Sequence, residues 1–507
     1  FQAEDGIRDD LVTGVQTCAL PISRPQLIEA SIEEIQASLD SGDVTSVELV
    51  EWYLERIDAY DQQGPKLNVI QHRNVRAAEQ AEALDAERKR SGPRSLLHGI
   101  PVVVKDNYET IDAPTTAGSV ILEGYWPKRD ATQVARLKAA GAIMLAKTTM
   151  HEFAYGWTTR GSAFGMTRNP YDVERHAGGS SGGTGAAVAA NFAAAGMGSD
   201  TCGSIRVPSA HNNLVGLRGT QGLSSRHGIV PLSSSRDLGG PLTRSARDLA
   251  IMLDATVGYD PSDLQTVESV GKIPVSYHAN LRRLDPKELR LGVLSGWFGD
   301  DRETNAQIER VLAKLDESGA SIERLASPAL ERLHEATLPP HAYVVDDHDL
   351  IHDLTAYLQQ YPSLPVRSFA DLVEDGRLEG YVGELWRGLR DNKSLGSRAV
   401  YLEAHAQGQD IRRQILGLLA EHDIDALVYP TATEEALALR AEQSHFNCKL
   451  AAASGMPAIS VPAGFGEHGM PVAIELLAEP WAEQKLLNLA YTIEQLAPAR
   501  QLPRQTP

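Results

Sequence analysis

The chain has 507 residues and a formal net charge of −19, from 48 Lys and Arg against 67 Asp and Glu. This balance argues against nucleic acid as a main ligand, because phosphate binding needs clustered positive charge. No run approaches the roughly 18 apolar residues of a membrane span, and the cysteines (Cys18, Cys202 and Cys448) are too few to indicate a disulfide framework. We therefore expect a cytoplasmic protein from a reducing compartment, with no nucleic-acid or membrane partner.

The first residues differ from the rest of the chain. Residues 2–9 and 12–22 look like a translated sequencing adapter, which suggests a gene assembled from shotgun, metagenomic reads. Such scars are left out of fold reasoning. The alternative is a short amphipathic leader, but the segment lacks the basic start and the apolar core of a signal peptide. We expect residues 1–23 to be a disordered tail.

Helical and strand patterns alternate along the remainder. Helical patterns occur at residues 45–60, 131–140, 185–195, 245–256, 305–318, 404–422 and 482–494. Short apolar runs typical of strands occur at residues 100–104, 143–146, 291–294, 426–429, 458–461 and 472–477. The alternation predicts an α/β fold with a large mixed, parallel-rich central sheet covered by helices on both faces.

Length alone would suggest about three domains of roughly 150 residues. The chemical motifs described next are spread along the whole chain, however, and this favours a single domain over residues 24–507. The polar stretch at about 300–425 interrupts the strand pattern. We expect it to be a helical insertion near the entrance to the functional site.

Two serines and a lysine carry the strongest chemical signal. Ser180 lies in the glycine-rich run Gly178–Gly183, and Ser204 follows Asp200 by four residues. Lys105 follows the apolar run 100–104, which is expected to be a buried strand. A serine hydroxyl needs a base within hydrogen-bond reach, and a lysine can act as that base only where burial keeps it neutral near pH 7. The pattern indicates acyl transfer without histidine, although most lysines are simply exposed.

Other interpretations of these motifs remain. Residues 178–182 also satisfy G-x-S-x-G, the nucleophile elbow that would make Ser180 the nucleophile, but an elbow needs a strand directly before it and residues 169–177 form a polar loop. The glycine run lacks the Gly-Lys-Ser/Thr of a phosphate-binding loop. The S-x-x-K match at residues 269–272 stands in a polar connection without companion motifs, and we attribute it to chance.

A metal site is the remaining alternative. His341, His348 and His352 would share one face of a helix, beside Asp347 and Asp349. The simpler interpretation is a solvated acidic face within the insertion, because no other group of metal-ligating residues lies nearby in the sequence. We expect neither a metal nor another cofactor.

The glycine run, together with Gly203-Ser204-Ile205-Arg206, resembles the amidase signature family. The resemblance extends through further segments at residues 97–101, 152–154, 168–170, 216–218, 239–241, 455–458 and 469–472. It implies the amidase signature fold, with Ser204 as the nucleophile, Ser180 as a bridging serine after a cis peptide bond at Gly179–Ser180, and Lys105 as the base.

The resemblance also implies which groups surround the reacting atoms. The backbone N–H groups of Thr201, Cys202, Gly203 and Ser204 would form the oxyanion hole. We expect Asp200 and Arg206 to pair and brace this loop. Many relatives have glycine where this chain has Cys202, and we favour simple packing of its side chain as a small buried hydrophobe.

Aromatic residues precede the glycine run. We expect Phe153 and Phe164 to pack in the core, and Tyr155 and Trp157, with Gly179, to contact the substrate.

Through the resemblance we expect a hydrolase of amide or carbamate bonds in small apolar or aryl substrates, such as an aryl acylamidase or a urethanase, active as a monomer or homodimer. The alternative is a glutamine amidotransferase subunit that works in a complex; a non-catalytic scaffold is disfavoured, because all three catalytic positions are filled.

Overall fold

The computed structural model describes residues 27–338, 343–392, 394–395, 397–443 and 445–507. The proposed adapter tail and His341 lie outside the described residues, so the predictions about them are not addressed by the structure.

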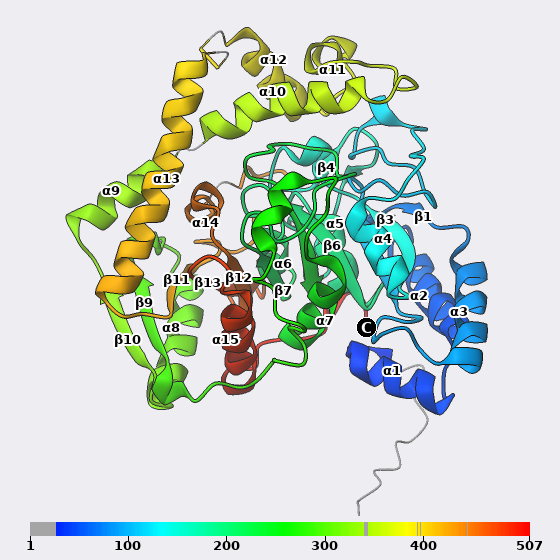
Figure 1. Ribbon diagram of the computed structural model, residues 1–507, viewed down its shortest axis with the longest axis horizontal. Coiled ribbons are helices and arrows are strands. Elements are labelled where there is room, and N and C mark those ends of the chain that lie inside the picture. Colours follow the sequence, from blue (N-terminus) through cyan, green and yellow to red (C-terminus); the bar gives the residue numbers. More distant parts are fainter. Residues whose placement is uncertain (1–26, 339–342, 393, 396, 444) are drawn as a thin grey trace, which may run out of the picture.

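A large mixed sheet organises the described residues (Figure 1). Its strand order is β1-β3-β2-β6-β8-β7-β12-β13-β11-β9-β10. In chain order the strands are β1 (Ile70–Arg73), β2 (Pro101–Lys105), β3 (Ile143–Thr148), β6 (Ala195–Asp200), β7 (Val215–Arg218), β8 (Leu238–Thr243), β9 (Arg290–Leu294), β10 (Ser321–Leu325), β11 (Ala426–Pro430), β12 (Ala458–Phe465) and β13 (Pro471–Leu477). A separate hairpin pairs β4 (Arg160–Gly161) with β5 (Gly165–Met166).

The predicted mixed sheet is confirmed, and its parallel pairing is confined to two stretches. Strands β3, β2 and β6 run parallel, as do β11, β9 and β10. The six other neighbouring pairs in the described sheet are antiparallel. The sheet is therefore parallel near both ends and antiparallel through its centre, so the prediction that it is rich in parallel pairs was wrong.

Helices cover both faces of the sheet. They are α1 (Ile32–Ser41), α2 (Ser46–Tyr60), α3 (Ala77–Ser91), α4 (Thr132–Ala139), α5 (Gly182–Ala189), α6 (Arg206–His211), α7 (Ala246–Thr256), α8 (Arg302–Glu317), α9 (Pro328–Ala336), α10 (Val344–Gln359), α11 (Phe369–Asp375), α12 (Gly380–Asp391), α13 (Arg398–Glu421), α14 (Lys449–Ser454) and α15 (Glu483–Leu496). None of these described helices is long and apolar enough to cross a bilayer.

Strand β7 shows how the two faces are divided. A Cβ at Gly216 would overlap the Ser209 hydroxyl of α6. Its neighbours Val215 and Leu217 belong to the core cluster that also holds buried residues of α7, α8 and α15. Because successive residues of a strand point to opposite faces, α6 covers one face and α7, α8 and α15 cover the other.

Strand β6 was missing from the sequence prediction, and its composition explains why. The residues of Ala195–Asp200 are mostly small and carry little β-branched or aromatic signal. The close approach of α5 requires this, because a Cβ at Gly196 would overlap the Thr184 methyl group. Helix α5 also ends earlier than predicted, at Ala189, and the chain turns at Asn191 with a φ of 56°.

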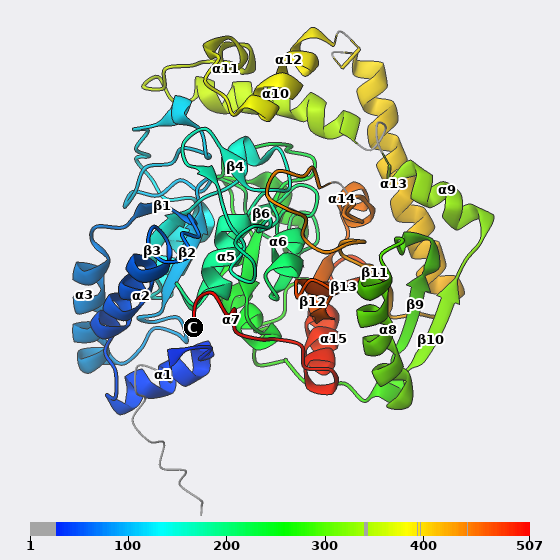
Figure 2. The same ribbon diagram turned by 180° about the vertical axis from the view of Figure 1, so that it is seen from behind.

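The predicted insertion at 300–425 is helical from α9 onward. Its first part belongs to the main sheet, since α8 packs on the sheet and β10 pairs with β9. Helices α10, α11 and α12 lie together along one side of the molecule, and α13 returns from them to the region of β9 and β10 (Figures 1 and 2). The helices α9 to α13, which we call the helical segment, place the start of α10 beside the functional site.

Candidate active site

Lys105 is the last residue of β2 and is fully buried. Its amine donates to the Ser180 hydroxyl at 2.7 Å and to the Ser199 hydroxyl at 2.8 Å. The Asn107 side-chain amide donates to the same Ser199 hydroxyl at 2.9 Å. The lysine is thus held by two hydroxyl groups, one of which is itself positioned by an amide.

Burial lowers the pKa of Lys105 to about 7, against an opposing effect of the Asp237 and Asp200 carboxylates. Lys147, at the corresponding end of the neighbouring strand β3, is equally buried but forms an ion pair with Asp106 at 3.0 Å. Among the described residues Lys105 has no such ion pair. A buried amine without a carboxylate partner is available in its neutral form near pH 7, which a base requires.

Ser180 follows a cis peptide bond at Gly179–Ser180, as the resemblance implied. The Ser180 carbonyl accepts from the His151 N–H at 2.9 Å, and the Ser181 N–H donates to the Ser204 carbonyl at 3.2 Å. The second bond holds the two serine-bearing segments side by side, and the first attaches Ser180 to the segment that follows β3. A Cβ at Gly179 would lie 2.6 Å from the Trp157 carbonyl carbon, so only glycine fits there.

The Asp200 carboxylate organises the segment from Asp200 to Arg206, which we call the oxyanion loop. It accepts from the N–H groups of Gly203 at 2.8 Å and Ile205 at 3.2 Å. It also forms buried ion pairs with Arg206 at 3.1 Å and Arg218 at 2.9 Å. Although burial alone would raise the pKa of Asp200, the two guanidinium groups hold it below its usual range. The predicted Asp200–Arg206 pair is therefore present and is reinforced by Arg218.

The N–H groups of the oxyanion loop differ in whether they already have a hydrogen-bond partner. The Gly203 N–H is directed to Asp200, which removes it from the group of four donors that the sequence suggested. Thr201 is fixed from its side chain, which donates to Asp237 at 2.5 Å. The N–H groups of Thr201, Cys202 and Ser204 therefore remain the predicted donors to an oxyanion.

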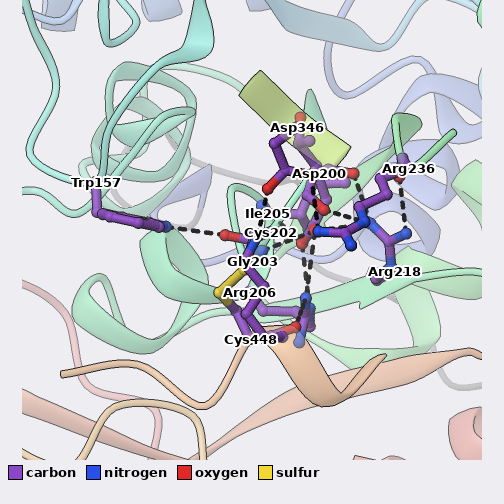
Figure 3. The surroundings of a disulfide bond; sticks show 12 residues. Trp157, Asp200, Cys202, Gly203, Ile205, Arg206, Arg218, Arg236, Asp346 and Cys448 are labelled. Carbon is purple, nitrogen blue, oxygen red and sulfur yellow. Dashed lines mark hydrogen bonds and ion pairs between the residues drawn. A yellow bond between two sulfur atoms is a disulfide. The ribbon is translucent and has the colours of Figure 1, made fainter. Parts of the chain in front are cut away.

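Cys202 forms a disulfide with Cys448, across a sequence separation of 246 residues (Figure 3). The expectation that both cysteines are free, and that Cys202 simply packs, was wrong. The two Cα atoms lie 5.2 Å apart, within the range that a disulfide needs. The bond ties the oxyanion loop to the residue before α14, and the prediction of a reducing compartment loses its support.

Trp157 contacts the same loop. Its indole N–H donates to the Cys202 carbonyl at 2.9 Å, as Figure 3 shows. Asp200, the disulfide and Trp157 therefore hold the oxyanion loop from three sides.

A cavity of about 560 Å³ opens onto this loop. Its described lining includes Ser204, Thr201 and Cys202, while Lys105, Ser180, Gly179 and Gly203 lie outside the lining. The remaining wall is largely apolar or aromatic, with Ala154, Tyr155, Trp157, Leu232, Leu338, Tyr343, Tyr381 and Leu385. Its acidic members are Asp346, Asp347 and Glu442, and the described lining contains no lysine or arginine.

The structure thus brings Lys105, Ser180 and Ser204 together and places Tyr155 and Trp157 in the cavity wall. Phe153 is buried in the core, whereas Phe164 is half-buried. The sequence analysis missed Ser199 and Asn107, which hold the lysine, and Tyr343 and Asp347, which line the cavity. Because strand β6 was not predicted, the sequence offered no signal for Ser199 beyond its position next to Asp200.

The histidine alternative gains no support from the described residues. His348 and His352 lie on α10 with ring centroids 4.5 Å apart. The parts of the chain that the structure describes contain no group of three or more His, Cys, Asp or Glu side chains arranged to hold a metal ion.

Known proteins resemble this chain in fold and in sequence. The model of the amidase family matches residues 48–487. A glutamyl-tRNA(Gln) amidotransferase subunit from Moorella thermoacetica is 34% identical over 488 residues, covering 93% of this chain and 97% of that protein. The structure of a peptide amidase from Stenotrophomonas maltophilia matches with a TM-score of 0.86 and 34% identity, covering 94% of this chain and 99% of that one.

A further structure, that of a glutamyl-tRNA(Gln) amidotransferase subunit from Thermotoga maritima, matches with a TM-score of 0.76 and 27% identity, covering 94% of this chain and 98% of that one. The fold is thus common to a peptide amidase and to amidotransferase subunits.

The lowered pKa of Lys105, about 7, predicts the pH dependence of the reaction. A base must be neutral to accept a proton, so with Lys105 in its predicted role kcat/KM for an uncharged amide should rise about tenfold between pH 6 and pH 8 and then level off. A pH series of kcat/KM tests this. An acid limb that stays unchanged in a residually active Lys105→Ala variant would assign the titration to another group.

The disulfide predicts a redox-dependent stability. The Cys202→Ala/Cys448→Ala variant should lose about 2–4 kcal/mol of unfolding free energy and part of its kcat, because the oxyanion donors lose one support. Chemical unfolding and kinetics with and without a thiol reductant measure both effects. Reductant should shift the wild type toward the variant and leave the variant unchanged; a reductant effect of equal size on both proteins would contradict this role.

Proposed function

Because the chain belongs to the amidase family, an enzyme family that acts on C–N amide bonds, we propose that it hydrolyses amides and carbamates of small aryl-bearing substrates through an acyl-enzyme on Ser204. The observation that carries the proposal is the buried Lys105 amine, which has no ion pair among the described residues and is bonded to the Ser180 hydroxyl at 2.7 Å. It lies beside a segment whose Ser204 opens onto the cavity.

In the proposed reaction Ser204 attacks the substrate carbonyl. Its proton passes to Ser180, and Ser180 passes its own proton to the neutral amine of Lys105. The carbonyl oxygen becomes negative and is stabilised by the N–H groups of Thr201, Cys202 and Ser204. The protons return through Ser180 to the leaving nitrogen as the C–N bond breaks. Water then enters by the same steps and releases the acid.

A carbamate would follow the same path. Loss of the amine leaves a carbonate ester on Ser204, and loss of the alcohol leaves a carbamoyl ester. Hydrolysis releases the amine, the alcohol and carbon dioxide in either case. The reaction needs no cofactor in this scheme.

The cavity wall supports an aryl-bearing substrate. Aromatic side chains contribute large apolar areas that stack on a flat ring, and Tyr155, Trp157, Tyr343 and Tyr381 supply them here. An anilide also leaves as a weakly basic amine, so proton delivery by Ser180 is less demanding than for an alkylamine.

A component of an amidotransferase complex that releases ammonia from glutamine is the second candidate. The match to the Moorella thermoacetica protein favours it. The cavity disfavours it, because glutamine carries a carboxylate and the described lining offers acidic side chains and no lysine or arginine. We therefore retain a free-standing enzyme, monomeric or homodimeric, as the main proposal.

The triad is tested by substitution. Ser204→Ala and Lys105→Ala should each lower kcat by at least about a thousandfold, and Ser180→Ala somewhat less, since the nucleophile and the oxyanion donors remain. Ser38→Ala is a matched control, because its buried hydroxyl on α1 bonds a main-chain carbonyl four residues before it, at 2.9 Å, and lies outside the candidate site. Circular dichroism should show that all four variants are folded. Near-normal turnover by Ser204→Ala would restore Ser180 as the candidate nucleophile.

The substrate class is tested on the purified chain alone. We expect kcat/KM to be highest for a nitroanilide or an aryl carbamate and lowest for glutamine. Glutamine as the best substrate, or activity that appears only with partner subunits, would favour the amidotransferase alternative.

A further inference from the structure

The start of α10 brings two adjacent carboxylates, Asp346 and Asp347, to the wall of the cavity. Acidic side chains are favoured in the first turn of a helix by its dipole, which accounts for their presence there. The dipole does not explain why the two carboxylates have different surroundings. These surroundings give Asp346 a structural role and leave Asp347 facing the substrate cavity.

Asp346 is neutralised by two buried cations. Arg236 donates to it at 2.9 Å, and the Lys449 amine forms a second ion pair with it. These pairs connect α10 to the loop before β8 and to α14, and Figure 3 shows Arg236 and Asp346 close to the oxyanion loop. Asp346 therefore attaches the helical segment to the core of the enzyme.

Asp347 has no ion pair among the described residues. Its side chain is bound by the Tyr155 hydroxyl, which donates to Oδ1 at 2.8 Å. The side chain is only half-buried and lies in the lining of the cavity. A carboxylate oxygen can accept two hydrogen bonds, so acceptor capacity remains on Asp347 toward the cavity.

Two tyrosine rings of the cavity wall also favour an N–H donor on the substrate. The Lys449 amine lies 4.0 Å from the Tyr343 ring centroid, and the Arg160 guanidinium lies 4.3 Å from the Tyr381 ring centroid. Both rings belong to the cavity wall and already have a cation over one face. Tyrosine rings attract N–H groups and cations through their negative faces, and the two contacts show that the rings of this wall accept such groups.

From these contacts we infer that Asp347 is a specificity-determining residue that accepts a hydrogen bond from an amine or another N–H donor on the aryl part of the substrate. The inference rests on the proposed function and narrows its substrate class. Aryl amides and carbamates that carry an amino group would be preferred, isosteric methyl compounds would be poorer, and carboxylate analogues would be rejected.

The test uses three acetanilides whose para substituents are amino, methyl and carboxylate. Reaction is followed by chromatography at pH 8, where Lys105 is neutral and Asp347, whose pKa burial raises to about 6, is ionised. Since the substituents also change the intrinsic reactivity, the quantity compared is the amino-to-methyl ratio of kcat/KM in wild type and variant. Asp347→Asn should lower this ratio about tenfold and raise the relative rate of the carboxylate compound.

Glu384→Gln is the matched control. It removes the same charge from an exposed position on α12, within the same helical segment, and should leave both ratios as in the wild type. Thermal unfolding verifies that Asp347→Asn is folded, as expected from an isosteric change that still accepts from Tyr155. A second series of three compounds carries the amino, methyl and carboxylate substituents on the acyl side of the amide bond instead.

The outcomes distinguish a failure of the proposed function from a failure of the role of Asp347. No hydrolysis of any of the six compounds by the wild type would contradict the proposed function itself. Hydrolysis with substituent ratios that are the same in wild type and Asp347→Asn, in both series, would overturn the role of Asp347 and leave the proposed function standing.

Discussion

The site depends on a lysine that is removed from water without being given a carboxylate. A buried ammonium ion without a counter-ion is costly, so the surroundings favour the neutral amine. The fold arranges this by placing Lys105 at the end of a buried strand and surrounding its amine with the hydroxyls of Ser180 and Ser199. Lys147, one strand away, has its own carboxylate and shows the usual solution. Under the proposed function, this difference allows Lys105 to act as a base, whereas Lys147 remains structural.

The second requirement is a loop whose N–H groups keep a fixed direction while charge develops on the substrate. Asp200 meets it from the buried side by binding two N–H groups and two guanidinium groups. The Cys202–Cys448 disulfide and the indole of Trp157 hold the same segment from the cavity side. Preorganisation of this kind makes stabilisation of the transition state effective, because little reorganisation is needed when the reaction occurs.

The sequence predicted the parts of the site that local pattern and family resemblance can reach. The apolar run before Lys105 located a buried strand, and the glycine run located Ser180. The disulfide could not be predicted, because Cys202 and Cys448 are 246 residues apart and meet only through the sheet order. Strand β6 was missed because its contact with α5 selects small residues. Asp347 was treated as part of a solvated face, since only the tertiary structure shows that α10 begins beside the cavity.

In the proposed reaction, the helical segment separates substrate recognition from chemistry, and this bears on how relatives of this enzyme can acquire new substrates. The reacting groups belong to the sheet and to the loops that follow it, whereas Tyr343, Asp347 and Tyr381 of the cavity wall belong to the helical segment. A few polar contacts, such as Asp346 with Arg236 and Asp349 with the Ser233 hydroxyl at 2.7 Å, join the two parts. Transplanting this segment between relatives, with those contacts kept, offers a modular route to new selectivity that leaves the inherited catalytic apparatus intact.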